Sequence, residues 1–254
     1  MNDQTEIPEE LIQIIRKAEH VTVLTGAGIS AESGVPTFRE AQTGLWARYD
    51  PQELATPQAF QRNPKLVWEW YTWRRELIGK AEPNPGHHAL AEMAQLVPKF
   101  TLITQNIDGL HQRAGSQDVV TLHGNLMETK CFANQHLVDN WPESDAVPPH
   151  CPICDSLLRP NVVWFGENLP ADALQTAVQA AESCDLFLSI GTSALVHPAA
   201  SLPLMAVENG ATTVELNPQS TPLTRWMDFV LTGAAGELLP LLVTSLKEAF
   251  NNDA

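Results

Sequence analysis

The sequence feature that most constrains the fold is the run VTVLTGAGISAESGVPTFR, which occupies residues 21–39. Its β-branched first part predicts a buried strand, and the Gly-Ala-Gly step predicts a tight turn into a helix. Glycine lets the backbone approach a diphosphate, and the free N–H groups of a helix's first turn face the anion. The G-x-G-x-x-G fingerprint is incomplete, because Ala31 stands where the third glycine would fall. The run therefore predicts a nucleotide-binding turn or, alternatively, an ordinary strand-to-helix turn of an α/β core.

Apolar β runs alternate with helical patterns along much of the chain, which predicts an α/β fold with a doubly wound parallel sheet. Strands are expected at 20–25, 100–105, 118–124, 162–165, 185–191, 212–217 and 228–233. A tryptophan- and proline-rich helical insert and an irregular cysteine-containing insert interrupt this alternation. We expect the sheet domain to comprise 1–39, 84–125 and 160–254, and a smaller domain to comprise 40–83 and 126–159.

Composition narrows the range of partners. The chain has 254 residues and a net charge of -15, which argues against non-specific binding to nucleic acid or anionic membranes. The same charge suits basic partners such as lysine-rich peptides. The acidic first ten residues do not resemble a signal peptide, and the four cysteines are unevenly placed. We therefore expect a cytoplasmic, reduced, monomeric protein that spans no membrane, and we interpret any cysteine cluster as a metal site.

Polar or glycine residues follow five of the predicted strands. In open parallel sheets, ligands bind beyond the carboxyl ends of the strands. Each segment alone is compatible with ordinary turn chemistry, but five that converge on one crevice indicate a site. The segments are Gly26-Ala27-Gly28, Gln105-Asn106-Ile107-Asp108, His123-Gly124, Gly191-Thr192-Ser193 and Asn217.

These segments also carry a family resemblance. The strings GAGIS and GVPTFR in 26–39, TQNIDGLH at 104–111, LHGNL at 122–126, GTS at 191–193 and ELN at 215–217 resemble sirtuin motifs. Sirtuins are NAD-dependent protein lysine deacylases, and the resemblance extends from the first strand to residue 235. It implies a Rossmann-like domain with a smaller zinc-type domain. It also implies NAD as co-substrate and acyl-lysine proteins or peptides as substrates, with release of nicotinamide and O-acyl-ADP-ribose.

The resemblance implies a role for each matching residue in cofactor binding. The turn from Gly26 to Ser30, with Phe38 and Arg39, would hold the diphosphate and cover the nicotinamide ribose. Gln105, Asn106 and Asp108 would line the nicotinamide pocket, where a carboxamide needs both donors and acceptors. Further expected cofactor contacts are Gly191, Thr192 and Ser193 for phosphate and ribose, Asn217 for the adenosine ribose, and Thr37, Trp46, Ile107 and Ala235.

His123 and Asn106 are the expected catalytic residues. An imidazole whose pKa lies near about 6.5 can take a proton from a ribose hydroxyl at neutral pH. His123 would be this general base, and the alternative is a core histidine at a strand end. His111 begins a helix, and we expect it to pack or cap. Two other functions remain open: an NAD glycohydrolase or ADP-ribosyltransferase at the same site, and an NAD- or ADP-ribose-sensing module without turnover, in which a general base would have no use.

Two segments resemble substrate-binding parts of sirtuins. Val163-Trp164-Phe165-Gly166-Glu167 resembles a segment to which an extended peptide adds as a strand, although a buried strand has the same pattern. Tyr71 and Arg74 lie three residues apart on one helix face, where most such pairs are surface residues. Yet the Tyr-x-x-Arg motif resembles that of sirtuins that remove succinyl, malonyl and glutaryl groups. The fork of donors on arginine fits the two oxygens of a carboxylate. With Ala55 as the matching small residue, the resemblance implies a preference for acidic acyl groups and weaker deacetylation.

The cysteine-containing insert departs from the sirtuin pattern of two Cys-x-x-Cys pairs. Cys151-Pro152-Ile153-Cys154 is complete, but the pair that starts at Cys131 has Asn134 in its second position. Structural zinc sites use four ligands, usually thiolate or imidazole. One interpretation is a zinc ion on Cys131, Cys151 and Cys154, with a fourth ligand such as His136 or His150. The other is a metal-free module that is held by its own packing.

Overall fold

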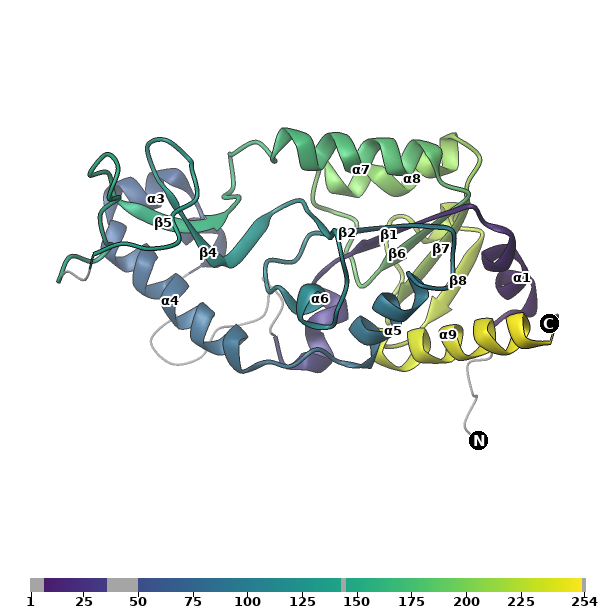
Figure 1. Cartoon of the computed structure of the whole chain (residues 1–254). Helices are drawn as coiled ribbons and strands as arrows, with labels where there is room; N and C mark the ends of the chain where they lie inside the picture. Colours follow the sequence, from purple (N-terminus) through teal and green to yellow (C-terminus); the bar gives the residue numbers. More distant parts are fainter. Residues whose placement is uncertain (1–6, 36–49, 143–144, 253–254) are drawn as a thin grey trace.

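The computed structural model describes residues 7–35, 50–142 and 145–252. It consists of a helix-covered parallel sheet and, at the opposite end of the molecule, a smaller unit of helices and two strands (Figure 1). Thr37, Phe38, Arg39 and Trp46 lie outside the described residues. Within those residues, no helix is long and apolar enough to cross a lipid bilayer.

The sheet is parallel throughout and has the order β3-β2-β1-β6-β7-β8. The predicted doubly wound parallel sheet is therefore confirmed. The strand order reverses between β1 and β6, so the carboxyl ends of these two strands flank the switch point at which such sheets bind ligands. The strands are β1 (His20–Thr25), β2 (Lys99–Thr104), β3 (Val120–Thr121), β6 (Leu186–Ile190), β7 (Thr212–Asn217) and β8 (Phe229–Thr232).

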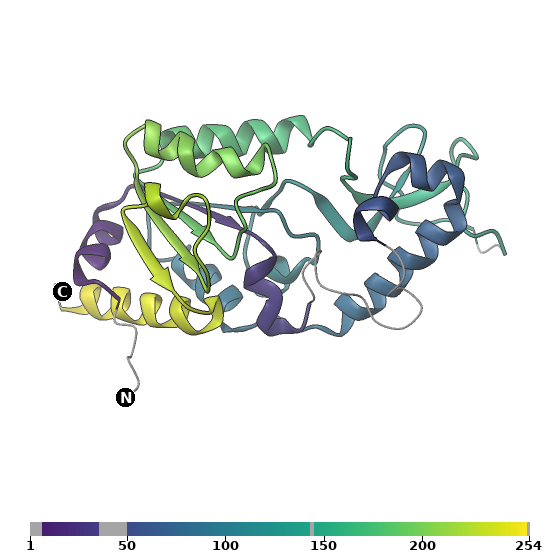
Figure 2. The same cartoon turned by 180° about the vertical axis from the view of Figure 1, so that it is seen from behind.

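Helices cover both faces of the sheet (Figures 1 and 2). One layer contains α1 (Glu9–Lys17), α5 (Pro85–Met93) and α9 (Ala235–Asn251), and the other contains α7 (Ala171–Ser183) and α8 (Leu202–Glu208). All six residues of β1 are buried. Val21 and Val23 belong to the core under the first layer and Leu24 to the core under the second. This two-sided burial explains why the strand reads as an unbroken apolar and threonine run.

The smaller unit packs helices against an antiparallel pair of strands, β4 (Gly124–Cys131) and β5 (Leu158–Val162). Its helices are α2 (Pro51–Leu54), α3 (Pro57–Arg62) and α4 (Pro64–Lys80). Thr56 and Asn63 cap α3 and α4 through their side chains, and each is followed by proline at the first helical position. The helical insert expected from the tryptophan- and proline-rich part of the sequence is therefore present as these helices.

Two predicted strands differ from the structure. The expected strand at 118–124 shrinks to the two residues of β3, because the chain turns out of the sheet at Gly124, whose φ is +81°. A Cβ at Gly124 would lie 2.1 Å from the Asn161 carbonyl oxygen, so β4 and β5 meet at close backbone approach. The extended structure expected from Val162 belongs to β5, which ends there in the smaller sheet. The predicted domain boundaries stay a prediction.

Short helices complete the connections. They are α6 (Leu110–Arg113) and the 3-10 helices η1 (Ala27–Ser33), η3 (Ala199–Ser201) and η4 (Thr224–Trp226).

Candidate functional site

The glycine turn after β1 is packed directly on the end of β6. Gly26 N–H donates to the Ile190 carbonyl at 2.9 Å, and Gly28 N–H donates to the Gly191 carbonyl at 2.8 Å. A Cβ at Gly28 would lie 2.7 Å from the Cα and the carbonyl oxygen of Gly191. The two glycines are therefore required by a backbone-to-backbone contact at the switch point. The helix that the turn enters is the 3-10 helix η1, which Gly34 ends at a φ of +75°.

The predicted polar residues at four strand ends are joined by hydrogen bonds. Gln105 Nε2 donates to Thr192 Oγ1 at 3.1 Å, and Asn217 Nδ2 donates to the Thr192 carbonyl at 3.0 Å. Asn106 Nδ2 donates to the Gly26 carbonyl at 3.0 Å. The structure thus brings the ends of β1, β2, β6 and β7 into one cluster, as the strand-end argument predicts. Ser193 is exposed beside Thr192, and Ile107 is half-buried.

A buried carboxyl group lies at the base of this cluster. Ser30 Oγ donates to Asp108 Oδ2 at 2.7 Å, and Leu110 N–H donates to Asp108 Oδ1 at 2.9 Å. Burial raises the pKa of Asp108, and these two hydrogen bonds oppose the shift. Ser30 also lies 3.2 Å from Asn106 Nδ2, so the glycine turn and the predicted nicotinamide residues share one network.

Two buried histidines adjoin the network. His87 Nε2 lies 3.4 Å from Ser30 Oγ, and the His87 and His111 rings are 4.9 Å apart. Burial lowers the pKa of His87 to about 4 and that of His111 to about 3, so both rings are neutral at neutral pH. The sequence analysis missed His87. Its signal was the start of α5, where His87 and Asn84 form a capping box. His111 packs in the core, bonded to Thr25 Oγ1 at 2.9 Å.

His123 sits where the chain leaves the parallel sheet for β4. Its Nδ1 lies 2.8 Å from the Gln105 carbonyl oxygen. A carbonyl oxygen can only accept, so Nδ1 carries the proton and Nε2 keeps its lone pair. Burial lowers the pKa of His123, and the bond to the carbonyl partly opposes this. The ring is therefore a neutral, oriented base at neutral pH, which is what general base catalysis requires.

Ala235, a further predicted cofactor contact, lies at the start of α9. It is the buried first residue of α9, and its carbonyl oxygen lies 3.0 Å from where a Cβ on Gly86 would stand. The neighbouring Gly236 N–H donates to Glu32 Oε2 of η1 at 2.6 Å. The structure thus places the start of α9 against η1 and α5, and a contact of Ala235 with NAD stays a prediction.

Tyr71 and Arg74 of α4 are buried, with 3% and 8% of their surfaces exposed. The ordinary surface-pair interpretation is therefore wrong, because both side chains point into the core of the smaller unit. The Arg74 guanidinium lies 5.3 Å from the Trp70 ring centroid. Burial lowers the pKa of Arg74, and Tyr71 opposes that shift. Ala55 is buried in the same core.

The segment 163–167 follows β5 and makes backbone contacts with both His123 and Ala55. Val163 N–H donates to the His123 carbonyl at 2.9 Å, and Phe165 N–H donates to the Ala55 carbonyl at 2.9 Å. Trp164 is buried, Val163 is half-buried, and Phe165 and Gly166 are exposed. The buried-strand interpretation therefore fits only part of the segment, because β5 has already ended at Val162.

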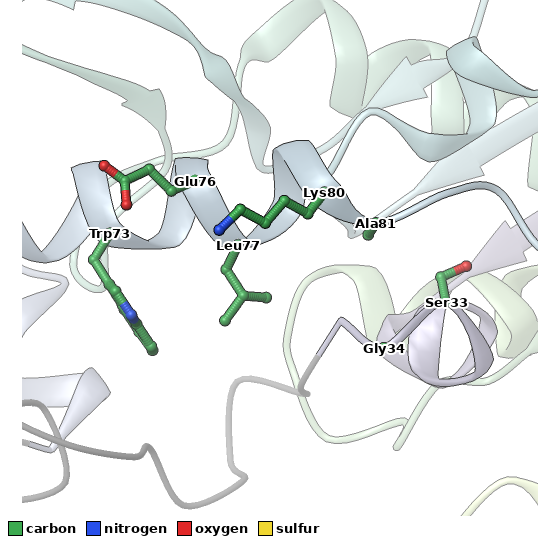
Figure 3. A pocket seen from close by; sticks show the side chains of 7 residues that line it. All are labelled: Ser33, Gly34, Trp73, Glu76, Leu77, Lys80 and Ala81. Atoms are coloured by element: carbon green, nitrogen blue, oxygen red, sulfur yellow. The ribbon is translucent and has the colours of Figure 1, made fainter.

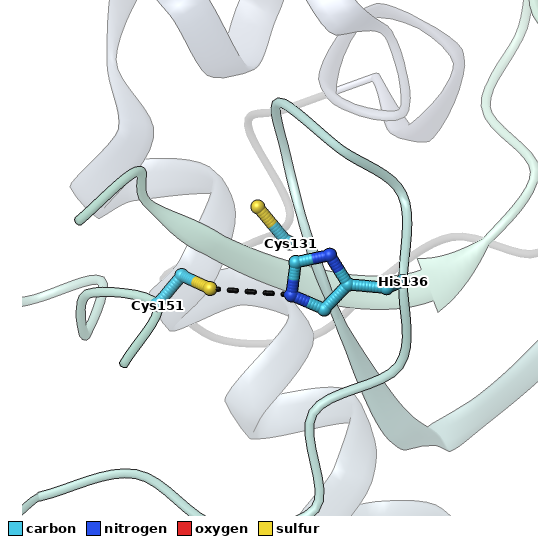
Figure 4. Close-up of side chains that lie close together, drawn as sticks. All are labelled: Cys131, His136 and Cys151. Atoms are coloured by element: carbon cyan, nitrogen blue, oxygen red, sulfur yellow. Dashed lines mark hydrogen bonds between the residues drawn. The ribbon is translucent and has the colours of Figure 1, made fainter. Parts of the chain in front are cut away.

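A cluster of sulfur and imidazole donors lies in the cysteine-containing insert (Figure 4). The donor atoms of Cys131, His136 and Cys151 all lie within 4.8 Å of one another. Cys151 Sγ is 3.3 Å from His136 Nε2, and Cys154 Sγ is 3.5 Å from Cys131 Sγ. All four cysteines of the chain are free thiols. Three sulfurs and one imidazole are a donor set that fits structural zinc.

Asn134, which stands in place of the missing cysteine, and His150, the other possible substitute, do not join this cluster. Asn134 is exposed, and its backbone N–H donates to Cys131 Sγ at 3.5 Å. His150 directs Nδ1 at Asp155, 2.7 Å from the carbonyl oxygen. His136 is therefore the histidine that the fold brings to the cysteines.

A pocket of 320 Å³ opens between α4 and the end of η1 (Figure 3). It shares no lining residue with the clusters around His123 or Tyr71. Its lining residues are Ser33, Gly34, Trp73, Glu76, Leu77, Lys80 and Ala81.

Comparisons with curated proteins give similar chains of matching length. A protein of Methylococcus capsulatus, named NAD-dependent protein deacylase, is 49% identical over 252 residues, covering 96% of this chain and 99% of that protein. A protein of Aquifex aeolicus with the same name is 50% identical over 235 residues, covering 92% of this chain and 98% of that protein.

Solved structures agree with these relatives. A crystal structure described as a Sir2 homolog–NAD complex has a TM-score of 0.89 at 47% identity, covering 96% of this chain and 95% of that chain. Another, described as Sir2–p53 peptide–NAD⁺, has a TM-score of 0.81 at 31% identity, covering 96% of this chain and 98% of that chain. The family model described as Sir2 family matches residues 26–198. The resemblance to the sirtuins is thereby confirmed, and this chain belongs to the Sir2 family.

Proposed function

We propose that this protein removes acyl groups from protein lysines at the expense of NAD, with a preference for acidic acyl groups. The relatives named NAD-dependent protein deacylase support the first part, because they match almost the whole chain. The observation that carries the chemistry is the hydrogen bond that holds His123 as a neutral base beside the strand-end cluster.

Each residue of the strand-end cluster is proposed to have a role that its chemistry allows. His123 takes a proton from a ribose hydroxyl through Nε2, while Nδ1–H stays on the Gln105 carbonyl. Asn106 and Asp108 offer the donors and acceptors that a carboxamide needs. The glycine turn and Thr192 accommodate the phosphates and ribose at the switch point of the sheet. NAD supplies the ribose carbon that receives the acyl oxygen as nicotinamide leaves.

The burial of a cation in the smaller unit supports the proposed preference for acidic acyl groups. Desolvation of Arg74 disfavours its charged form, which is the direction in which burial moves its pKa. An anionic acyl group can accept charge-assisted hydrogen bonds from a guanidinium through its carboxylate, which a neutral acetyl group lacks. Tyr71, one turn away, adds a neutral hydroxyl donor.

The experiment is mass spectrometry of NAD-dependent reactions on lysine peptides that carry acetyl, malonyl, succinyl or glutaryl groups. We expect higher kcat/KM for the three acidic groups and O-acyl-ADP-ribose as a product. Free ADP-ribose without acyl transfer would instead indicate a glycohydrolase. NAD binding without any product would indicate a sensing module.

The substrate peptide is proposed to lie beside Val163 to Glu167. The exposure of Phe165 and Gly166 supports this, because an extended peptide needs a partner segment that it can reach from solvent. A monomeric state and a cytoplasmic location stay predictions.

We also propose that one structural zinc is held by Cys131, His136, Cys151 and Cys154. Zinc there would supply a closed cross-link between the two loops of the insert. Elemental analysis of protein purified without a metal-affinity tag is expected to give one zinc per chain. His136→Ala should lower the zinc content and the melting temperature. His150→Ala, the matched control, should lower neither. Equal zinc content in wild type and His136→Ala would exclude His136 as a ligand.

A further inference from the structure

A buried ion pair fixes the turn at 164–167. Arg159 of β5 has no exposed surface, and its two terminal nitrogens bind both carboxylate oxygens of Glu167, at 2.5 and 2.9 Å. Arg159 Nη2 also donates to the Val162 carbonyl at 2.8 Å. Glu167 Oε2 in turn accepts from Trp164 N–H at 2.8 Å. The pair therefore holds the backbone at the Val162 carbonyl and at the Trp164 N–H.

The indole of Trp164 is equally constrained. The Arg159 guanidinium lies 3.3 Å from the Trp164 ring centroid, and the Phe60 ring lies 5.3 Å away. Trp164 is 1% exposed. Because both the backbone and the ring of Trp164 are held, its indole N–H points in a fixed direction. It donates to Tyr71 Oη at 3.0 Å. This bond joins residues 93 positions apart in the chain.

The hydrogen bond determines what the Tyr71 hydroxyl can do. A phenol can donate one hydrogen bond and accept others. Burial raises the pKa of Tyr71, so the group stays protonated. Because the indole N–H can only donate, Tyr71 accepts there, and its own proton is directed elsewhere. Arg74, one helical turn along α4, is its neighbour on the same face.

We propose that Trp164 is a positioning residue that sets acyl-group specificity, because its indole N–H aims the Tyr71 hydroxyl proton at an anionic acyl group. Arg159 and Glu167 hold Trp164 in place for this purpose. The inference rests on the proposed preference for acidic acyl groups. It links Trp164, in the segment proposed to bind the peptide, to Tyr71, which is proposed to bind the acyl group.

The test is a double-mutant cycle on Trp164→Phe and Tyr71→Phe. The readout is the ratio of kcat/KM for a succinyl-lysine peptide to kcat/KM for the same peptide acetylated. Trp164→Phe keeps an aromatic ring but removes the N–H donor. Loss of a neutral hydrogen bond should lower the ratio roughly two- to tenfold. In the Tyr71→Phe background the same change should leave the ratio unaltered, since the hydroxyl is gone.

Leu126→Ala is the packing control. It removes a fully buried side chain from the same core and no hydrogen bond to Tyr71, so it should lower the melting temperature and leave the ratio unaltered. Glu167→Gln is the second variant, for use if Trp164→Phe shows no cooperative unfolding. It weakens the bidentate pair with its shape retained, and it should lower the ratio only when Tyr71 is present.

The outcomes separate this inference from the proposed function. A wild-type enzyme without preference for succinyl-lysine would overturn the proposed function and this inference with it. A wild-type preference that Trp164→Phe leaves intact would overturn this inference alone. The same follows if Trp164→Phe lowers the ratio equally with and without Tyr71, or if Leu126→Ala lowers it as much.

Discussion

The strand-end cluster around His123 and the aromatic cluster around Tyr71 are built in different ways. In the first, the two proposed catalytic side chains bind backbone carbonyls: His123 binds that of Gln105, and Asn106 binds that of Gly26. In the second, the bonds that hold Tyr71 and Trp164 include pairs of side chains, as Trp164 binds Tyr71 and Arg159 binds Glu167. The first is determined by the parallel sheet, whereas the second depends on the mutual packing of large residues. The proposed general base therefore depends on the parallel sheet, and the proposed acyl preference depends on the packing of large side chains.

The largest loss of activity is expected when His123, the proposed general base, is replaced. His123→Ala should lower deacylation by about 100- to 10,000-fold, because a positioned general base typically contributes that factor. NAD binding, measured by calorimetry, should persist, since the glycine turn and Thr192 remain. Near-normal turnover in a well-folded variant would remove His123 from the mechanism.

The second largest effect is expected in the pH dependence of stability, which tests the buried histidines next to the first cluster. The pKa of His87 is lowered to about 4 in the folded state, so between about pH 6.5 and pH 4 the unfolded chain binds the additional proton. Stability is therefore fully present above about pH 6.5 and falls as the pH drops towards 4, by up to about 3 kcal/mol for this group. Urea unfolding across this range measures it.

His87→Asn should make that pH dependence shallower. His197→Asn, at an exposed histidine, is the control and should leave it unchanged. An identical pH slope in wild type and His87→Asn would show that the buried imidazole contributes nothing to it.

The next prediction concerns the second cluster. Arg74→Met keeps much of the apolar stem and removes the guanidinium. Charge-assisted hydrogen bonds contribute roughly 1.5–3 kcal/mol each, so the ratio of desuccinylation to deacetylation should fall about tenfold or more. Paired peptide assays measure it. If both activities fell in the same proportion, Arg74 would support the fold and not the acyl preference.

The smallest expected effect tests the backbone contact of the first cluster. Gly28→Ala would place a Cβ 2.7 Å from Gly191 backbone atoms, and such overpacking costs about 1–3 kcal/mol. Gly79→Ala is the control: nothing lies within 4 Å of its Cβ position in α4, so the better helix former should stabilise by up to about 1 kcal/mol. Thermal unfolding compares them, and an unaffected Gly28→Ala would show that the turn can shift.

The sheet and the first cluster could be predicted because their signals are local. Buried strands read as apolar runs, and the residues that follow a parallel strand must lie at its carboxyl edge. Gly26, Asn106, His123, Thr192 and Asn217 therefore lie at the same edge of the sheet, whatever the side chains elsewhere do. Even here the strand expected at 118–124 was wrong in length, because Gly124 meets Asn161 only in the folded chain.

The sequence by itself determined the parallel sheet, the glycine turn and the residues at the strand ends, since each depends on neighbours along the chain. Only the tertiary structure decided that His136 and not His150 joins the cysteines. It also decided that Tyr71 and Arg74 are buried and that Trp164 binds Tyr71. These contacts join residues far apart in sequence through the shapes of large side chains. Their formation depends on three-dimensional packing, which no local pattern of residues encodes.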